Sequence, residues 1–183
     1  MTRVIIQPAS NKDSRKHFVD TVENPVDLSL HQPSAGSDFD KLMQLSENGK
    51  VAMWGVTPGK NGANLSKFKK IEVGDFVFFT RDNKVYSTGE ITHIFNNPKL
   101  ATEIWGTDAN NQTWENMYTL KNVESQEIPY PVLRNAIGSD SGDNFMGFRP
   151  LDSTKSVSAL PDWYSDNQLG YQGWRSSQAK RSS

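Results

Sequence analysis

Three consecutive segments in the middle of the chain decide the fold. They read V-A-M-W-G-V-T-P-G-K-N-G-A-N over residues 51–64, I-E-V-G-D-F-V-F-F-T over residues 71–80 and Y-S-T-G-E-I over residues 86–91. Each combines β-branched and aromatic residues and is bounded by Gly, Pro, Asn or Asp, a pattern typical of strands joined by tight turns. The sequence R-D-N-K at 81–84 supplies turn chemistry between the second and third segments, so these two are predicted to form a β-hairpin.

Further strands and short helices are predicted on both sides of the hairpin. Strands are expected over residues 3–8 and 113–123, and helices over 12–22, 39–45, 98–105 and 132–137. The first helix would begin with a capping box formed by Ser10 and Asp13, and the third with Asn97 followed by Pro98. Several strands in succession, interrupted by short helices, predict a mixed α+β fold around a partly closed β-barrel, because closure removes exposed sheet edges.

The composition of successive stretches divides the chain into three parts. Residues 1–49 are predicted to be an α-rich N-terminal extension, and residues 50–152 the β-barrel with its flanking helices. Residues 153–183 are rich in Ser, Gly and Gln and are predicted to be a flexible tail or linker. Four aromatic residues of this tail are candidate docking points: Trp163, Tyr164, Tyr171 and Trp174.

The composition limits the class of protein. With 183 residues, the chain has room for one domain of ordinary size and its appendages. Five Trp, five Tyr and nine Phe suffice for a core and leave aromatic side chains for binding. The chain has no cysteine, no run of about 20 apolar residues and no apolar signal segment at its N-terminus. We therefore expect a cytoplasmic protein without disulfides, thiol catalysis or a membrane span.

The sequence offers little catalytic chemistry. Its three histidines, His17, His31 and His93, form no metal-ligand spacing with one another or with a carboxylate, so each is expected on the surface or half-buried. The sequence G-V-T-P-G-K-N at 55–61 is one residue short of a phosphate-binding loop, and a Pro-Gly turn is the favoured interpretation. No catalytic residue, metal ligand or cofactor is predicted.

In their order and spacing, these segments resemble the EVE domains of the PUA-like superfamily, which are related to the YTH readers. The likeness covers residues 50–152 and is greatest to the recognition modules of modification-dependent restriction systems. It rests on Trp54-Gly55-Val56 with Asn61 and Asn64 downstream, V-G-D-F-V-F-F-T at 73–80, S-T-G-E-I at 87–91, Trp114, and F-M-G-F-R-P-L at 145–151. The F-F-T segment departs from the F-Y-x-S form common in EVE domains, and the N-terminal extension is not part of the minimal fold.

The resemblance implies a DNA-binding module that flips out and captures a modified base for a restriction or antiviral defence system. The base would be methylated or hydroxymethylated cytosine, or N6-methyladenine. Extrusion of a base costs a few kcal/mol, and stacking on an aromatic side chain returns about 1–3 kcal/mol. A buried methyl group adds only about 0.8 kcal/mol, so selectivity must come largely from pocket shape and polar groups. No nuclease or motor is recognisable in the sequence, so such a partner is expected elsewhere.

The predicted base-binding residues are indoles, asparagines and small or packing residues of the matching strands. They are Trp54, Gly55, Asn61, Asn64, Thr80, Trp105, Trp114 and Phe148. Indole faces would stack on the base, and asparagine amides would offer its edge both a donor and an acceptor. Core packing is the alternative role for the aromatic residues, and turn formation is the alternative role for the asparagines.

The predicted phosphate contacts come from basic residues. They are Lys60, Lys67, Lys69, Lys70, Arg81 and Arg149. The four lysines fall within residues 60–70, which contain no Asp or Glu, whereas the whole chain has a net charge of -1. Such contacts would fix the position of a nucleic acid without reading its sequence. An ordinary solvated face is the alternative.

Two other functions stay open on the sequence alone. One is an RNA-binding reader of modified bases, of the YTH or PUA kind, which would prefer single strands to duplex DNA. The other is a metal-dependent nuclease that uses Asp75, Asp82 and Lys84. A strand of about five residues would hold the two carboxylates roughly 17 Å apart, too far to share one metal, so turn roles are favoured for them.

Overall fold

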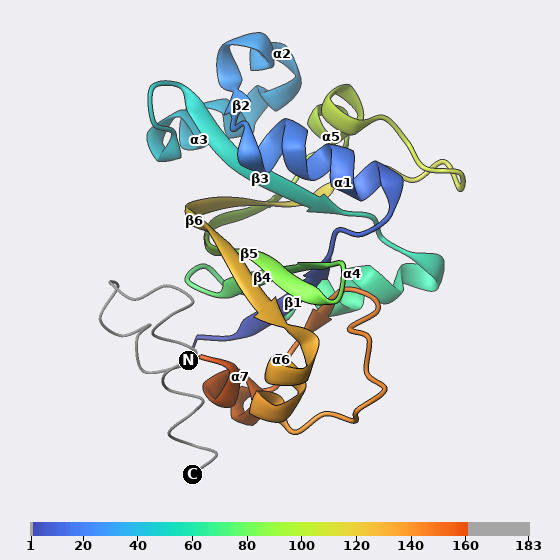
Figure 1. The fold of residues 1–183 in the computed structure, drawn as a ribbon. Helices are drawn as coiled ribbons and strands as arrows, with labels where there is room; N and C mark the ends of the chain where they lie inside the picture. The colour runs from blue at the N-terminus through green and yellow to red at the C-terminus, as the bar shows by residue number, and fades with distance from the viewer. Residues whose placement is uncertain (1, 161–183) are drawn as a thin grey trace. The chain divides into compact units, whose positions relative to one another are not determined.

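The computed structural model describes residues 2–160, which form two compact units (Figure 1). Unit 1 consists of residues 2–10, Gly74–Gly89 and 122–160, and unit 2 consists of Asn11–Val73 and Glu90–Lys121. The units are therefore interleaved along the chain. The predicted boundaries after residues 49 and 152 do not coincide with the limits of either unit. The division of the chain into three parts stays a prediction.

Seven strands form an open sheet in the order β2-β3-β6-β5-β4-β1-β7. They are β1 Val4–Pro8, β2 Val26–Asp27, β3 Lys50–Val56, β4 Phe76–Arg81, β5 Lys84–Asn96, β6 Asn116–Pro129 and β7 Arg149–Pro150. The predicted mixed α+β class is confirmed, but the described sheet is not closed into a barrel. Its two edges are strands of two residues each, which expose little unpaired backbone, so the sheet does not need closure to protect its edges.

The helices are short and are distributed between both units. In unit 2 they are α1 Lys12–Phe18, the π-helix η1 Val19–Glu23, η2 Leu28–Leu30, α2 Gln32–Ala35, η3 Gly36–Asp38, α3 Phe39–Leu45, η4 Lys60–Gly62, α4 Ala63–Phe68 and α5 Pro98–Trp105. In unit 1 they are α6 Tyr130–Ile137 and α7 Ser153–Ala159, which pack against each other (Figure 1). No helix in the described range is long and apolar enough to cross a membrane.

Unit 1 is organised around β1, which enters the sheet beside β4. The two strands are parallel, with Val4 opposite Phe76, and β7 pairs antiparallel to the other side of β1. The predicted hairpin is confirmed as β4 and β5, with Asp82 and Asn83 at φ values of 50° and 60° in the turn. Two successive positive φ values are what a tight type I′ hairpin turn requires. The core behind these strands includes Ile6, Phe78, Val85, Leu133 and Phe145.

Unit 2 is built on the antiparallel pair of β3 and β6, in which Trp54 lies opposite Tyr118 and Gly55 opposite Met117. Its core includes Leu28, Leu42, Met53, Leu100 and Met117. The predictions for α3 and α5 are confirmed residue for residue. The predicted capping box at the first helix is wrong, because Asn11 and not Ser10 is the N-cap: its Oδ1 accepts from Ser14 N at 2.8 Å.

Several helical segments differ from the sequence-based expectations. The helix predicted over 12–22 is divided into α1 and η1, and no helix was predicted over residues 28–38, where η2, α2 and η3 occur. Helix α4 was not predicted, and it begins directly after Gly62, whose φ of 71° ends the preceding turn. Helix α6 begins two residues earlier than expected, at Tyr130. Helix α7 lies in the segment that was predicted as a tail, with Asp152 as its N-cap. The four aromatic candidates of the tail, residues 163, 164, 171 and 174, lie outside the described residues.

Asn97 connects three helical segments of unit 2 through one buried side chain. Its Oδ1 accepts from Leu100 N at 2.9 Å and so caps α5. Its Nδ2 lies 3.2 Å from both Ser34 O and Ala35 O and 2.9 Å from Asp38 Oδ2. The side chain is 9% exposed, so its loss would leave these acceptors and an amide without a protein partner.

We predict that Asn97→Ala lowers the free energy of unfolding by about 2–3 kcal/mol, because it removes a helix cap and buried hydrogen bonds together. Urea unfolding followed by circular dichroism measures the change. Asn110→Ala is the matched control, since Asn110 is exposed in the loop after α5, and a change below about 0.5 kcal/mol is expected there. Equal effects of the two substitutions would contradict the proposed bridging role.

Candidate functional site

Three tryptophans of unit 2 surround the imidazole of His17. Trp54 lies in β3, Trp105 ends α5, and Trp114 lies two residues before β6. We call these three residues the indole cluster. The centroid of the His17 ring is 4.5 Å from that of Trp114, 5.8 Å from that of Trp105 and 6.5 Å from that of Trp54. The predicted aromatic residues of unit 2 are therefore brought together around a residue that was not predicted to belong to the site.

The members of the indole cluster differ in exposure. Trp54 is only 3% exposed and its ring centroid lies 6.3 Å from that of Phe18, so it forms the inner side of the cluster. Trp105 and Trp114 are half-buried, and they are the members that a ligand can reach from solvent. Replacement of Trp54 would consequently test the stability of unit 2, whereas replacement of Trp114 tests recognition more directly.

Gly55 permits a close approach between β3 and the segment that carries Trp114. A Cβ atom at position 55 would lie 2.2 Å from Trp114 O, 2.8 Å from Trp114 Cβ and 2.7 Å from Trp105 Cζ3. Two of these contacts are with the main chain or its first side-chain atom, which cannot rotate away. The role of Gly55 is therefore to let the two half-buried indoles lie against the strand.

Gln112 holds together the two loops that flank the indole cluster. Its Oε1 accepts from Gly59 N at 3.0 Å, and its Nε2 donates to Gly59 O at 3.3 Å. Gln112 N in turn donates to Asp108 Oδ1 at 2.9 Å, and Thr113 Oγ1 donates to Gly106 O at 2.8 Å. These bonds fix the path of the loop that leads from α5 to Trp114.

The predicted asparagines follow Gly59: Asn61 lies in η4 and Asn64 in the first turn of α4. Asn61 is exposed and has a φ of 54°, so its amide is available to a ligand while its backbone completes the turn. Asn64 is half-buried, and its side chain lies 3.0 Å from the position of a Cβ at Gly59. Its backbone N–H donates to Pro58 O at 3.0 Å. Both residues thus have structural roles as turn residues as well as accessible or partly accessible amides.

The four predicted lysines continue from the same loop into α4 and the residues that follow it. Lys60, Lys69 and Lys70 are exposed, and Lys67 is half-buried. The segment is anchored by Phe68, which is 7% exposed and stacks on Tyr118 with ring centroids 6.4 Å apart. The anchored segment presents positive charge in a stretch without acidic residues, which is suited to phosphate groups.

The surroundings of the indole cluster favour the uncharged form of His17. Burial is the largest influence on His17 and lowers the pKa of its imidazole below the ordinary value of 6.5, against the opposing effects of Asp13 and Asp20. The imidazole is therefore uncharged at pH 7. The Nε1 donor of Trp105 is shielded from solvent and has no acceptor among the described residues. A buried donor of this kind is available to an acceptor on a ligand.

The remaining predicted residues belong to unit 1. Thr80 is 1% exposed, and its Oγ1 has no hydrogen-bond partner within the described part of the chain. Arg81 is half-buried, with its guanidinium carbon 4.0 Å from the centroid of the Tyr86 ring. Phe148 is 4% exposed and therefore packs inside the unit.

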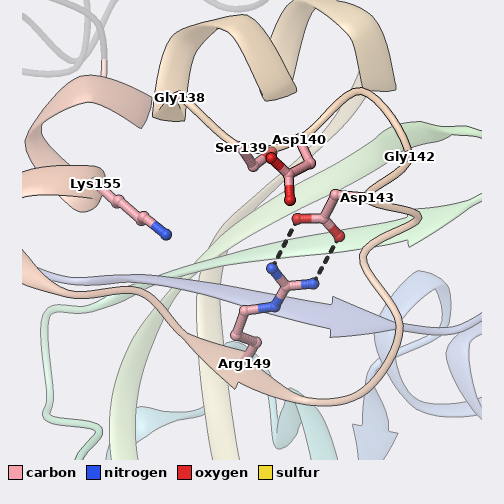
Figure 2. Close-up of a pocket in the computed structure, with 7 residues that line it drawn as sticks. All are labelled: Gly138, Ser139, Asp140, Gly142, Asp143, Arg149 and Lys155. Atoms are coloured by element: carbon pink, nitrogen blue, oxygen red, sulfur yellow. Dashed lines mark hydrogen bonds and ion pairs between the residues drawn. The ribbon is translucent and has the colours of Figure 1, made fainter.

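Arg149 lines a polar cavity of about 630 Å³ in unit 1 (Figure 2). Its two terminal nitrogens each donate to Asp143 at 2.9 Å, and these bonds are the main reason that the pKa of Asp143 falls to about 2. Asp140 and Lys155 are the other charged residues of the lining, so the four charges sum to zero. The charge of Arg149 is compensated inside the protein, and the cavity offers no net attraction to a phosphate.

The described residues show no arrangement suited to metal chemistry. No group of three or more His, Asp or Glu side chains that could hold a metal ion occurs between residues 2 and 160. Asp75 is buried and its Oδ1 accepts from Arg3 N at 2.9 Å, whereas Asp82 lies exposed in the hairpin turn. Asp75 is therefore a buried, hydrogen-bonded residue, and Asp82 is a residue of an exposed turn.

Sequence analysis missed two residues that shape the site. His17 gives no signal in the sequence beyond its place in a helix, and its position among the indoles depends on the packing of α1 in unit 2. Gln112 lies in a polar loop, and its two bonds to Gly59 span 53 residues of sequence. No local pattern identifies either residue.

We predict that Gly55→Ala lowers the free energy of unfolding by about 2–3 kcal/mol, because the added methyl group must displace the main chain at Trp114. Urea unfolding followed by tryptophan fluorescence measures both stability and the environment of the indoles. Gly142→Ala is the control, since no atom lies within 4 Å of the added Cβ there. A Gly55→Ala protein with the stability and fluorescence of the parent would refute the close-approach argument.

Comparison with known proteins shows a likeness in structure and none in sequence. No family model matches the sequence, and no curated protein matches it either. Among solved structures, the N-terminal domain of Thermococcus gammatolerans McrB bound to m5C DNA superposes with a TM-score of 0.66. The match has 15% sequence identity and covers 92% of this chain and 100% of that chain. The chain is therefore similar in fold to the N-terminal domain of McrB.

Proposed function

We propose that this chain is a DNA-binding module that captures a modified base, within a modification-dependent restriction or defence system. The base is methylated or hydroxymethylated cytosine, or N6-methyladenine, and it is flipped out of the duplex. The observation that carries the proposal is the indole cluster, in which Trp105 and Trp114 are half-buried. Gln112, two residues before Trp114, bonds to Gly59, the residue directly before the lysine-containing segment 60–70. The similarity in fold to a domain whose structure was solved with m5C DNA supports it.

The energetics of base capture fit the indole cluster. Stacking on an indole contributes about 1–3 kcal/mol per base, which offsets the few kcal/mol that extrusion costs. Trp105 and Trp114 supply the reachable aromatic surface, with Trp54 as the buried wall behind them. The Nε1 donor of Trp105 and the amides of Asn61 and Asn64 supply hydrogen bonds to a base edge.

Binding and chemistry are separate in this proposal. The module holds DNA, and cleavage or translocation belongs to a partner nuclease or motor subunit. In unit 2 the phosphates lie along Lys60, Lys67, Lys69 and Lys70, which set the position of the duplex without reading its sequence. The predicted site residues of unit 1 are Thr80, Arg81, Phe148 and Arg149. They have packing or ion-pair roles in that unit, and any DNA contact they make is secondary.

We predict that Trp114→Ala weakens binding to a modified duplex by about 5- to 150-fold, the equivalent of the stacking energy of one base, and removes the preference for modified over plain DNA. The measurement is fluorescence anisotropy with duplexes that differ at one base: cytosine, 5-methylcytosine, 5-hydroxymethylcytosine, adenine or N6-methyladenine. Trp114→Phe is the control, because it retains a flat ring and should keep most of the preference. Thermal unfolding establishes that both variants are folded.

Equal affinity of the parent protein for modified and plain duplexes would refute the proposal. A single-stranded RNA of the same sequence is included in the panel, because tighter binding to it than to the duplex would assign the cluster to an RNA reader.

We predict a different pattern for the lysine segment. Replacing Lys60, Lys69 and Lys70 together by Gln should weaken binding to modified and plain duplexes by the same factor, because phosphate contacts carry no base information. The slope of log affinity against log salt should become shallower by about 0.9 for each phosphate that the variant no longer neutralises.

Lys99→Gln is the control for this experiment, since Lys99 is an exposed lysine of unit 2 that lies on α5 and outside the lysine segment. Its salt dependence should equal that of the parent protein. An unchanged salt dependence in the triple variant would place the phosphates elsewhere on the protein.

A further inference from the structure

One protein side chain, that of His17, contacts all three indoles. The His17 ring meets the Trp114 ring edge-on, with an interplanar angle of 89°, and lies tilted by 35° to the Trp105 ring. It also lies at 66° to the Trp54 ring. A flat heteroaromatic ring of the protein itself thus makes edge-on or tilted contacts with all three indoles.

The imidazole makes ring contacts with the three indoles and interacts with the charges of Asp13, Asp20 and Lys16. Its side chain makes no hydrogen bond to another residue of the described chain, and His17 is 9% exposed. Neither ring nitrogen is a fully shielded atom without a partner, so the imidazole keeps some contact with water. Its displacement breaks aromatic contacts but no hydrogen bond within the described part of the protein.

The helix that carries His17 continues into a segment that is bonded to β3. Downstream, Thr21 Oγ1 lies 2.7 Å from Met53 O, which ties η1 to β3. Upstream, α1 has seven residues, and Asn11, Lys12, Asp13 and Lys16 are exposed. The π-helix η1 begins at Val19, two residues after His17, and such segments are frequent at functional sites.

We propose that the His17 imidazole takes the place of the captured base when no DNA is bound, and that it must leave the indole cluster before a base can enter. This inference rests on the proposed function and adds to it an intramolecular competitor. The fraction of molecules with the imidazole displaced then sets the apparent affinity, which is reduced in proportion. The penalty is the same for modified and plain bases, so it lowers both affinities and leaves their ratio unchanged.

The first test compares the parent protein with His17→Ala and His17→Phe by anisotropy, using a 5-methylcytosine duplex, an N6-methyladenine duplex and their plain counterparts. His17→Ala empties the cluster and should bind the preferred modified duplex about tenfold more tightly, with the preference over plain DNA retained. His17→Phe fills the cluster again and should bind no more tightly than the parent. Weaker binding by His17→Ala, with the preference of the parent intact, would make His17 a wall of the site and overturn the inference.

The second test is an NMR measurement on the unsubstituted protein. The ring protons of His17 are expected to be strongly shifted by the surrounding indoles in the NMR spectrum of the parent protein. The chain has three histidines, and the spectrum of His17→Phe assigns the relevant signals. Saturation with the preferred modified duplex should move these signals to the values of a solvent-exposed histidine.

The outcomes separate the two proposals. His17 signals that stay shifted in a complex with a preferred modified duplex would overturn the displacement of His17 and leave the proposed function standing. Equal affinity of the parent for modified and plain duplexes would contradict the proposed function itself. The unfolding curve of His17→Ala separates a loss of stability from a change in DNA binding. The NMR measurement is made on the parent protein and does not depend on the stability of the variant.

Discussion

The arrangement of unit 2 depends on one close approach, between the backbone of β3 at Gly55 and the main chain at Trp114. The absence of a side chain at position 55 lets Trp105 and Trp114 lie directly on the strand, where a methyl group would be 2.2 Å from Trp114 O. Those two indoles, and Trp54 behind them, all contact the ring of His17. Gln112 keeps the loop before Trp114 in place through its paired bonds to Gly59.

The two units differ in how their charges are arranged. In unit 1, Arg149 and Asp143 form a bidentate pair, and the pKa of Asp143 falls to about 2 because the guanidinium stabilises its ionised form. That pair organises the loop between α6 and β7 and leaves little free charge. In unit 2, the lysines of residues 60–70 lie in a sequence segment without acids. A polyanion is therefore attracted by the lysine segment far more than by the polar cavity.

Much of the fold could be predicted because local signals decide it. Asn97 followed by Pro98 predicts the start of α5, and Asp82-Asn83 predicts the hairpin turn. The parallel pairing of β1 with β4 could not be predicted, since it joins Val4 to Phe76 and no local pattern specifies it. The expected barrel was wrong for a related reason: whether a sheet closes depends on which strands lie at its edges, and those are set by long-range pairing. In the candidate site, the indoles were predicted from the sequence and their role in binding stays a prediction, whereas His17 was not predicted.

The proposed site sets a limit on how selectivity can arise. Penalties shared by every base, such as unstacking from the duplex and displacement of the imidazole, cancel when two bases are compared. An added methyl group contributes only about 0.8 kcal/mol, roughly fourfold in affinity. A buried donor left without an acceptor costs about 1–3 kcal/mol, so in the proposed complex the indole N–H of Trp105 would distinguish bases by the acceptors they present. It follows that in the proposed complex the larger part of the selectivity is for the identity of the base, and that the fit of the indoles around the methyl group adds the smaller part.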